Sequence, residues 1–218
     1  MNKMILPALA IAVAAGAGGW WFMTQNQSPP VAAASTPTGQ ATEIHALDFP
    51  LGNPDASVVV VEYSSFTCPH CATFNQGAFQ QIKENFIDTD QILFLKREVY
   101  FDRYGLWAGM VARCGGGTRY HGMVELIYET QSSWAGSNDP AVVADNLRRL
   151  GRQAGMSNDE INACLEDADK ALELTEFYQA NAERYGIRST PSFVINGELF
   201  SNMPYAEFER VLTEKLGG

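Results

Sequence analysis

The sequence is poor in basic residues and contains no cluster of them. It has 15 Lys and Arg against 25 Asp and Glu, which gives a formal net charge of −10. A protein that binds a phosphate backbone needs clustered Lys and Arg. A phosphate-binding loop of the GxxxxGK type is also missing. The two absences argue against a nucleic-acid partner and against a P-loop enzyme.

Cysteine is scarce as well, with four residues in the 218 of the chain. Cys68 and Cys71 stand close together, whereas Cys114 and Cys164 are isolated and have no neighbouring ligand residue. A zinc site would need a second ligand pair. Attachment of a c-type haem would need His where Ala72 follows the second cysteine. The sequence therefore predicts no metal and no other cofactor.

The first 23 residues include an uncharged apolar stretch at residues 4–23. This stretch is about long enough to cross the hydrocarbon core of a bilayer as a helix. Ala32-Ala33-Ala34 offers a cleavage site of the signal-peptide type, while Trp20-Trp21 resembles an interfacial anchor. Residues 1–23 are therefore interpreted as a signal peptide or a membrane anchor. In both cases the rest of the chain is exported.

A tether and a strand–helix–strand unit follow. Residues 24–43 are rich in Gln, Ser, Pro, Ala and Thr, which is typical of a flexible linker. Val58–Tyr63 is a β-branched run that predicts a strand buried on both faces, and Gln91–Glu98 is interpreted as a second buried strand. A helical pattern from Pro69 to about Asn85 lies between them. These lengths predict a βαβ unit at the start of a folded part that spans residues 44–218.

The remainder of the chain changes from helices back to strands. Helical patterns run from about residue 102 to 185, and a capping box at Ser157–Glu160 opens a long helix that ends near Tyr185. Ser192–Ile195 and Glu198–Phe200 follow, joined by an Asn-Gly turn that favours a hairpin, and a last helix ends the chain. The sequence predicts an α/β protein, a thioredoxin-like fold with an inserted helical domain.

The sharpest chemical signal is Cys68-Pro69-His70-Cys71, between a buried strand and a helix. Pro69 suits the first helical position, which makes Cys68 the N-cap. A thiolate there would accept hydrogen bonds from the N–H groups of His70 and Cys71 at the positive end of the helix dipole, and the His70 side chain would add to this. We expect Cys68 to be an exposed, low-pKa nucleophile and Cys71 the buried resolving thiol. A stabilised thiolate makes the disulfide oxidising.

The motif Cys68-Pro69-His70-Cys71, with Thr190-Pro191 at the start of the downstream segment Thr190–Gly197, resembles the DsbA-like thiol:disulfide oxidoreductases. The resemblance covers about residues 45–218. It implies that Pro191 is a cis proline against the active-site disulfide and that the backbone of Thr190 pairs with a substrate strand. It also implies that the helical block shapes a groove for unfolded substrates.

Two charged residues interrupt the apolar strand runs, Glu62 in the first and Lys96 in the second. A lone charge in such a place is costly, so the two side chains are interpreted as a mutually satisfied buried pair. The resemblance implies that the pair also lies near Cys71, carries its proton and tunes its redox potential.

Cys114 and Cys164 remain. In an oxidising compartment two leftover cysteines usually pair, so a structural disulfide is favoured over a role as a redox relay. Some members of the family that the chain resembles carry such a second bridge in the helical domain.

The resemblance implies a periplasmic dithiol oxidase, either soluble or tethered to the inner membrane by residues 4–23. It would introduce disulfides into unfolded or newly exported cysteine-containing proteins and be re-oxidised by a quinone-linked membrane partner. Thr190 before the proline is also similar to disulfide isomerases and reductases of the same fold, which form the rival hypothesis. A third is a membrane-tethered binding protein or chaperone with structural cysteines.

Overall fold

The computed structural model describes residues 43–218. The signal peptide or anchor at 1–23 and nearly all of the linker at 24–43 lie outside the described residues. The described residues belong to one compact unit. Within this part of the chain, no helix is both long and apolar enough to span a membrane.

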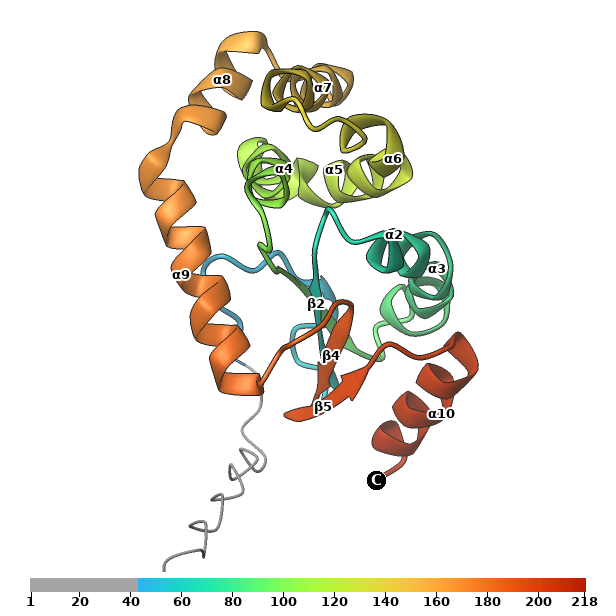
Figure 1. The fold of residues 1–218 in the computed structure, drawn as a ribbon. Coiled ribbons are helices and arrows are strands. Elements are labelled where there is room, and N and C mark those ends of the chain that lie inside the picture. The colour runs from blue at the N-terminus through green and yellow to red at the C-terminus, as the bar shows by residue number, and fades with distance from the viewer. Residues whose placement is uncertain (1–42) are drawn as a thin grey trace, which may run out of the picture. The chain divides into compact units, whose positions relative to one another are not determined.

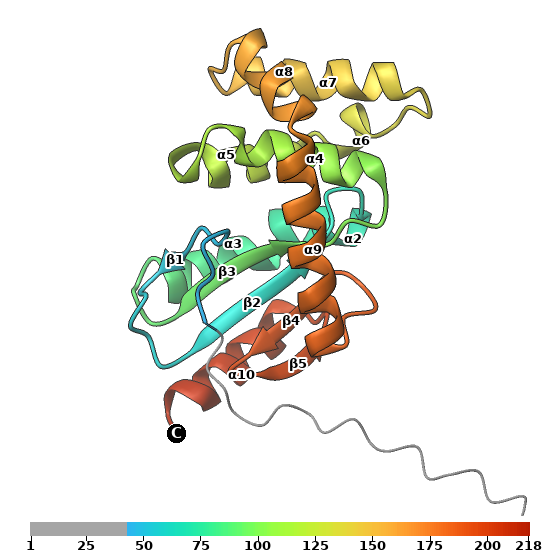
Figure 2. The ribbon, with the colours of Figure 1, turned by 90° about the vertical axis from the view of Figure 1, so that its left-hand side faces the viewer.

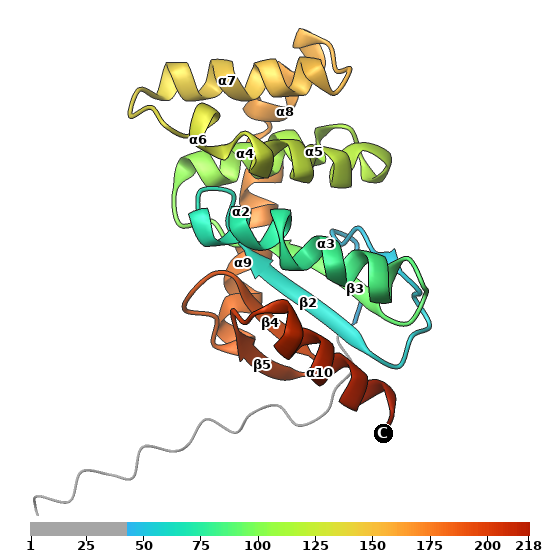
Figure 3. The ribbon, with the colours of Figure 1, turned by 90° about the vertical axis from the view of Figure 1, so that its right-hand side faces the viewer.

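A mixed sheet of five strands forms the centre, in the order β1-β3-β2-β4-β5. The neighbours β2 and β3 are parallel, and the other pairs are antiparallel. All residues of β2, β3 and β4 are buried, because helices cover both faces (Figures 2 and 3). The strands are β1 (Leu51–Gly52), β2 (Val59–Ser64), β3 (Leu93–Glu98), β4 (Ser192–Ile195) and β5 (Glu198–Ser201).

One face of the sheet is covered by α2 (Pro69–Gln76), α3 (Ala78–Ile82), the π-helical turn η1 (Lys83–Ile87) and α10 (Tyr205–Leu216), as Figure 3 shows. The predicted single helix from Pro69 to Asn85 was wrong. It breaks at Gly77, where φ is −118° and ψ is −94°. Glycine has little helix propensity, so this position yields readily to the packing on either side.

The helical insertion lies beyond the carboxyl end of β2 (Figure 1). It contains α4 (Arg103–Cys114), α5 (Gly117–Glu129), α6 (Gln131–Trp134), α7 (Pro140–Gln153) and α8 (Asn158–Glu166). The helix α9 (Ala168–Tyr185) then returns along the other face of the sheet (Figure 2).

The predicted long helix from Ser157 to Tyr185 is two helices, so its continuity was also wrong. Asp167 leaves the helical region with ψ at 89°, and its carboxylate accepts a hydrogen bond from the Lys170 backbone N–H at 2.8 Å. An Asp side chain favours this N-cap geometry over a helix interior. The capping box at Ser157 and the final Gly186 in the left-handed region are as predicted.

The predicted thioredoxin-like architecture with a helical insertion is confirmed. Asn196 and Gly197 both have positive φ, 49° and 84°, as the predicted type I′ hairpin requires. The strand β1 was not predicted, because a two-residue strand carries no periodicity. Its Gly52 has φ at +79°, and a Cβ there would meet the Ile92 carbonyl oxygen at 2.2 Å.

A buried ion pair fastens the insertion to the sheet. Arg113 of α4 donates to Glu98 of β3 through Nε at 3.0 Å and through Nη2 at 2.5 Å. Both side chains are almost fully buried, with 7% and 5% exposed. Tyr120 of α5 donates to the same carboxylate at 2.8 Å. The carboxylate of Glu98 therefore joins the sheet to two helices of the insertion.

We expect Arg113→Met to lower the free energy of unfolding by about 3–5 kcal/mol, because it leaves the Glu98 carboxylate buried without its cation. Urea unfolding followed by circular dichroism measures the change. Arg210→Met is the matched control, since Arg210 forms exposed ion pairs with Glu207 and Glu214. It should leave stability nearly unchanged. Equal effects of the two substitutions would contradict the anchoring role of Arg113.

Candidate active site

The two cysteines of the motif lie at the junction between β2 and α2. Cys68 is the N-cap of α2, with extended backbone angles (φ −87°, ψ 118°), and Pro69 occupies the first turn. Cys71 follows one turn later and its side chain is fully buried. This asymmetry arises because the first residue of the turn lies at the helix end and the fourth points into the core.

The cysteine-bearing turn is held from the helical insertion. The Gln131 side-chain amide donates to the carbonyl oxygens of Phe66 at 2.8 Å and Cys68 at 2.9 Å. The Thr67 hydroxyl donates to the Asp102 carboxylate at 2.6 Å. Sequence reasoning missed both contacts, because a single Gln or Thr carries no motif and its partner is far away in the chain.

The two sulfur atoms have different surroundings. The Cys68 thiol is partly exposed and donates to the Thr190 carbonyl oxygen at 3.4 Å. The Cys71 sulfur accepts a hydrogen bond from the Ser65 backbone N–H at 3.5 Å. Only Cys68 can therefore be reached by a thiolate from outside.

Burial by itself raises the pKa of the Cys68 thiol, but hydrogen-bonding groups around the sulfur outweigh it and hold the pKa below that of an ordinary cysteine. These groups are the Thr190 side chain, the backbone N–H and thiol of Cys71, and the His70 backbone N–H. The thiol itself forms no cap hydrogen bond, unlike the thiolate considered from the sequence. The Cys71 N–H donates to the Cys68 carbonyl at 3.1 Å instead.

The pKa of the Cys71 thiol shifts the other way. Burial raises it strongly, and the negative charges of Glu62 and ionised Cys68 raise it further. The Ser65 N–H and the Thr190 side chain each lower it, by more than either charge raises it and by less than burial does. The pKa values of the two thiols are therefore shifted in opposite directions, down for Cys68 and up for Cys71.

The Thr190–Pro191 peptide bond is cis, and Pro191 is buried at the entrance to β4. The Thr190 hydroxyl is buried and has no well-aligned hydrogen-bond partner among residues 43–218. The hydroxyl lowers the pKa of both thiols, which is the effect of a group that can donate a hydrogen bond to either thiolate. The structure thus brings Thr190 and Pro191 beside a motif more than a hundred residues earlier in the chain.

Glu62 and Lys96 face each other in the register of β2 and β3. Lys96 Nζ donates to Glu62 Oε2 at 2.8 Å, and the two side chains are 4% and 0% exposed. The ammonium also lies 3.5 Å from the centre of the Phe79 ring. The second carboxylate oxygen, Oε1, is buried and has no partner among the described residues.

The side chains of Pro69 and His70 take no part in these contacts. Pro69 and His70 are exposed, and no hydrogen bond of the His70 imidazole is found in the described part of the chain. Exposure leaves them free to meet a partner protein. Among residues 43–218, no group of three or more His, Cys, Asp or Glu converges as a metal site would require.

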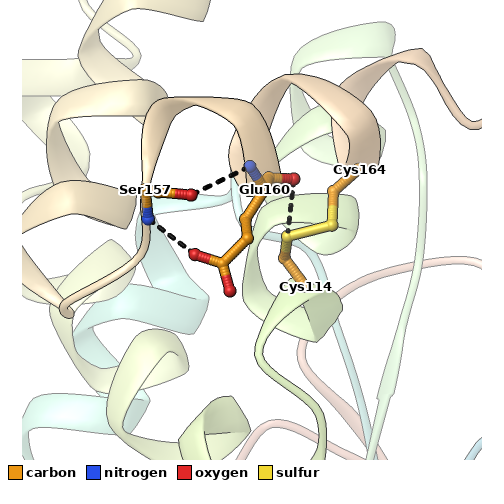
Figure 4. The surroundings of a disulfide bond; sticks show 4 residues. All are labelled: Cys114, Ser157, Glu160 and Cys164. Atoms are coloured by element: carbon orange, nitrogen blue, oxygen red, sulfur yellow. Dashed lines mark hydrogen bonds between the residues drawn. A yellow bond between two sulfur atoms is a disulfide. The ribbon is translucent and has the colours of Figure 1, made fainter.

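A disulfide joins Cys114, the last residue of α4, to Cys164 in α8, with 5.7 Å between the Cα atoms (Figure 4). The Cys114 sulfur contacts the Glu160 carbonyl oxygen at 3.4 Å. Glu160 also closes the capping box with Ser157, so the disulfide contacts the residue that caps the start of α8 (Figure 4). Cys164 lies late in α8, whereas the sequence placed it early in a longer helix.

Comparison with known proteins agrees with this arrangement. A family model described as Thioredoxin matches residues 47–214. The chain is 34% identical over 177 residues to a protein-disulfide oxidoreductase of Rickettsia typhi, covering 78% of this chain and 62% of the relative. The crystal structure of alpha-DsbA1 from Wolbachia pipientis matches with a TM-score of 0.72 at 25% identity, covering 80% of this chain and 93% of that one.

A third comparison shows likeness of fold alone. BdbD from Bacillus subtilis matches with a TM-score of 0.70 at 21% identity, covering 83% of this chain and 99% of that chain. The chain spans between 53% and 65% of the length of the Rickettsia relatives that it matches. On the extent of the family match and the CxxC geometry, the chain belongs to the thioredoxin family and is a DsbA-like member of it.

Proposed function

We propose that this protein is an exported thiol:disulfide oxidoreductase that donates the Cys68–Cys71 disulfide to other proteins. One observation carries the proposal: Cys68 is accessible at the N-cap of α2 whereas Cys71 is fully buried, so that their pKa values shift in opposite directions. The pKa of the accessible Cys68 is lowered and that of the buried Cys71 is raised. A disulfide between two such sulfurs is attacked at Cys68 and opens toward a stabilised thiolate.

The exchange proceeds in two steps. A substrate thiolate attacks the Cys68 sulfur, the Cys68–Cys71 bond breaks, and Cys71 leaves as a thiolate that takes up a proton because its pKa is raised. The second thiolate of the substrate then attacks the substrate sulfur of the mixed disulfide. Cys68 leaves as a thiolate, and its lowered pKa makes it a good leaving group. The substrate loses two electrons and the protein gains them.

The proton for Cys71 needs a route, because the thiol is buried. The Glu62 carboxylate lies near enough to influence the Cys71 pKa, and Lys96 holds that carboxylate by a charge-assisted hydrogen bond. In the proposed mechanism this pair passes the proton to Cys71 when the disulfide opens and takes it back when the disulfide closes.

The cis-proline segment receives the substrate. The Thr190 carbonyl accepts the hydrogen bond of the Cys68 thiol and is released when that sulfur joins a mixed disulfide. A substrate strand beside the sulfur can then donate to this carbonyl. Phe101 precedes Asp102, whose carboxylate accepts a hydrogen bond from Thr67 of the active-site turn. Phe101 is 57% exposed. It offers an apolar contact to an unfolded chain.

The substrates of this activity are newly exported or unfolded proteins that contain cysteines, and the proposed compartment is the periplasm. Continued turnover requires an oxidant for the Cys68–Cys71 pair, for which we propose a quinone-linked membrane partner. The Cys114–Cys164 bridge has a structural role in this proposal, since it ties α8 to α4.

Single-cysteine variants test the order of attack. Mixed with an oxidised, cysteine-containing peptide, Cys71→Ser is expected to accumulate a mixed disulfide at Cys68, because no resolving thiol remains. Cys68→Ser should form none, since Cys71 is buried. Mass spectrometry after acid quenching distinguishes the two. Full activity of Cys68→Ser would favour the binding-protein hypothesis and overturn the proposal.

The pH dependence of the free energy of unfolding tests the lowered pKa of Cys68. Because the folded pKa of Cys68 is lowered, its ionisation stabilises the folded, reduced protein above the unfolded-state pKa of about 8.5. This contribution is lost as the pH falls through the folded pKa. The free energy of unfolding of Cys71→Ser should therefore fall relative to that of a Cys68→Ser/Cys71→Ser double variant on acidification. A difference independent of pH would contradict the lowered pKa.

A glutathione redox titration decides the direction in which the pair works. A disulfide donor should have a potential nearer the about −120 mV of DsbA than the about −270 mV of thioredoxin. The isomerase or reductase hypothesis rests on Thr190 before Pro191, since Thr at this position is similar to the disulfide isomerases and reductases of the same fold. A potential near that of thioredoxin would replace the oxidase by this alternative.

A further inference from the structure

The Cys68 carbonyl oxygen has more hydrogen-bond donors than lone pairs. The Cys71 backbone N–H donates to it at 3.1 Å and the Ala72 N–H at 3.3 Å. The Gln131 side-chain amide donates to the same oxygen at 2.9 Å. A carbonyl oxygen has two lone pairs, so three donors share two acceptor positions. One of the three donors can therefore turn away while the oxygen keeps a partner for each lone pair.

Gln131 is a donor with a fixed position. It is the first residue of α6, and Trp134 of the same helix is fully buried and donates through Nε1 to the Ile127 carbonyl at 2.9 Å. The Gln131 side chain is itself buried. Its Nε2 also donates to the Phe66 carbonyl at 2.8 Å, so both N–H bonds of the amide are used. Because both partners are acceptors, the amide nitrogen and not the oxygen faces them.

The Cys71 N–H has a second possible acceptor, the Cys68 sulfur. The side chain of an N-cap residue accepts from the second or third N–H of its helix, here those of His70 and Cys71. The Cys68 thiol forms no such bond in the structure. A thiolate is a stronger acceptor than a neutral carbonyl, and the Cys71 N–H is among the groups that lower the Cys68 pKa. Ionisation of Cys68 therefore favours a turn of this N–H from the carbonyl to the sulfur.

We propose that Gln131 is a positioning residue for the nucleophile, because it keeps the Cys68 carbonyl hydrogen-bonded when the Cys71 N–H turns to the Cys68 thiolate. The inference rests on the proposed function. Without Gln131 the turn would leave the carbonyl with the Ala72 N–H alone, which makes the longest of the three bonds. The loss of a partner at this partly buried oxygen costs free energy, and that cost would oppose the thiolate. One side chain of the helical insertion thus helps to set the redox potential of the cysteine pair.

Two matched substitutions separate this role from a purely structural one. Gln131→Met keeps the length of the side chain and removes both of its donors. Gln76→Met is the control, since the Gln76 amide donates to the Tyr128 carbonyl of α5 at 3.1 Å. Gln76 thereby ties α2 to the insertion at the opposite end of the helix from Cys68. A general loosening of α2 would change both variants, whereas loss of the donor to Cys68 changes only the first.

The full chain of each variant is measured in two ways. The pH dependence of Cys68 alkylation by iodoacetamide in the reduced protein reports the Cys68 pKa, and a glutathione titration reports the equilibrium between dithiol and disulfide. Gln131→Met should raise the pKa of Cys68 and shift the equilibrium about fivefold toward the disulfide, the effect of one lost hydrogen bond. Gln76→Met should leave both at their wild-type values. An unchanged Cys68 pKa in Gln131→Met, or equal changes in the two variants, would overturn the inference.

A measurement on the wild-type protein decides the question even if Gln131→Met does not fold. In nuclear magnetic resonance spectra of the reduced protein, the Cys71 N–H should move downfield as Cys68 ionises. The Gln131 side-chain N–H protons should stay protected from solvent exchange, relative to a free amide at the same pH. Loss of that protection on ionisation would refute the role of Gln131. The proposed function fails separately, if the wild-type pair has a redox potential near that of thioredoxin.

Discussion

The unequal environment of two sulfurs, one turn apart on the same helix, is the constraint on which the rest of the structure depends. Cys71 is buried against the Ser65 backbone, whereas Cys68 remains at the helix end beside Thr190. Burial keeps a proton on Cys71, and the groups around Cys68 favour its thiolate. A disulfide between them is therefore unsymmetrical in its chemistry. This property requires β2, α2 and the segment before β4 to meet at one point.

Three consecutive charged residues of β3 connect that point to the remainder of the protein. Lys96 pairs with Glu62 of β2, Arg97 with Asp48 before β1, and Glu98 with Arg113 of α4. All three are buried, although a β-strand in the middle of a sheet is normally apolar. Each charge reaches a different element, so β3 fixes β2, the N-terminal segment and the insertion relative to one another.

The helical insertion contributes to the site as well as covering it. Gln131 fixes the turn that precedes Cys68 from one side, and Asp102 holds it through Thr67 from the other. His121, from a third helix of the same block, lines a small cavity together with Lys96. The insertion therefore fixes the position of the turn that carries Cys68, which links the two parts of the domain physically.

The sequence alone determined the features that depend on neighbouring residues. These are the CxxC turn with Pro69 in the first helical turn, the Asn196-Gly197 hairpin, the capping box at Ser157 and the fold class read from the order of strands and helices. Only the tertiary structure decided the helix breaks at Gly77 and Asp167, the hydrogen bonds from Gln131 to the active-site turn and the position of His121. Capping and turn preferences act within a few residues, whereas burial, pKa and the pairing of a buried polar group are set by side chains that the chain brings together from far apart.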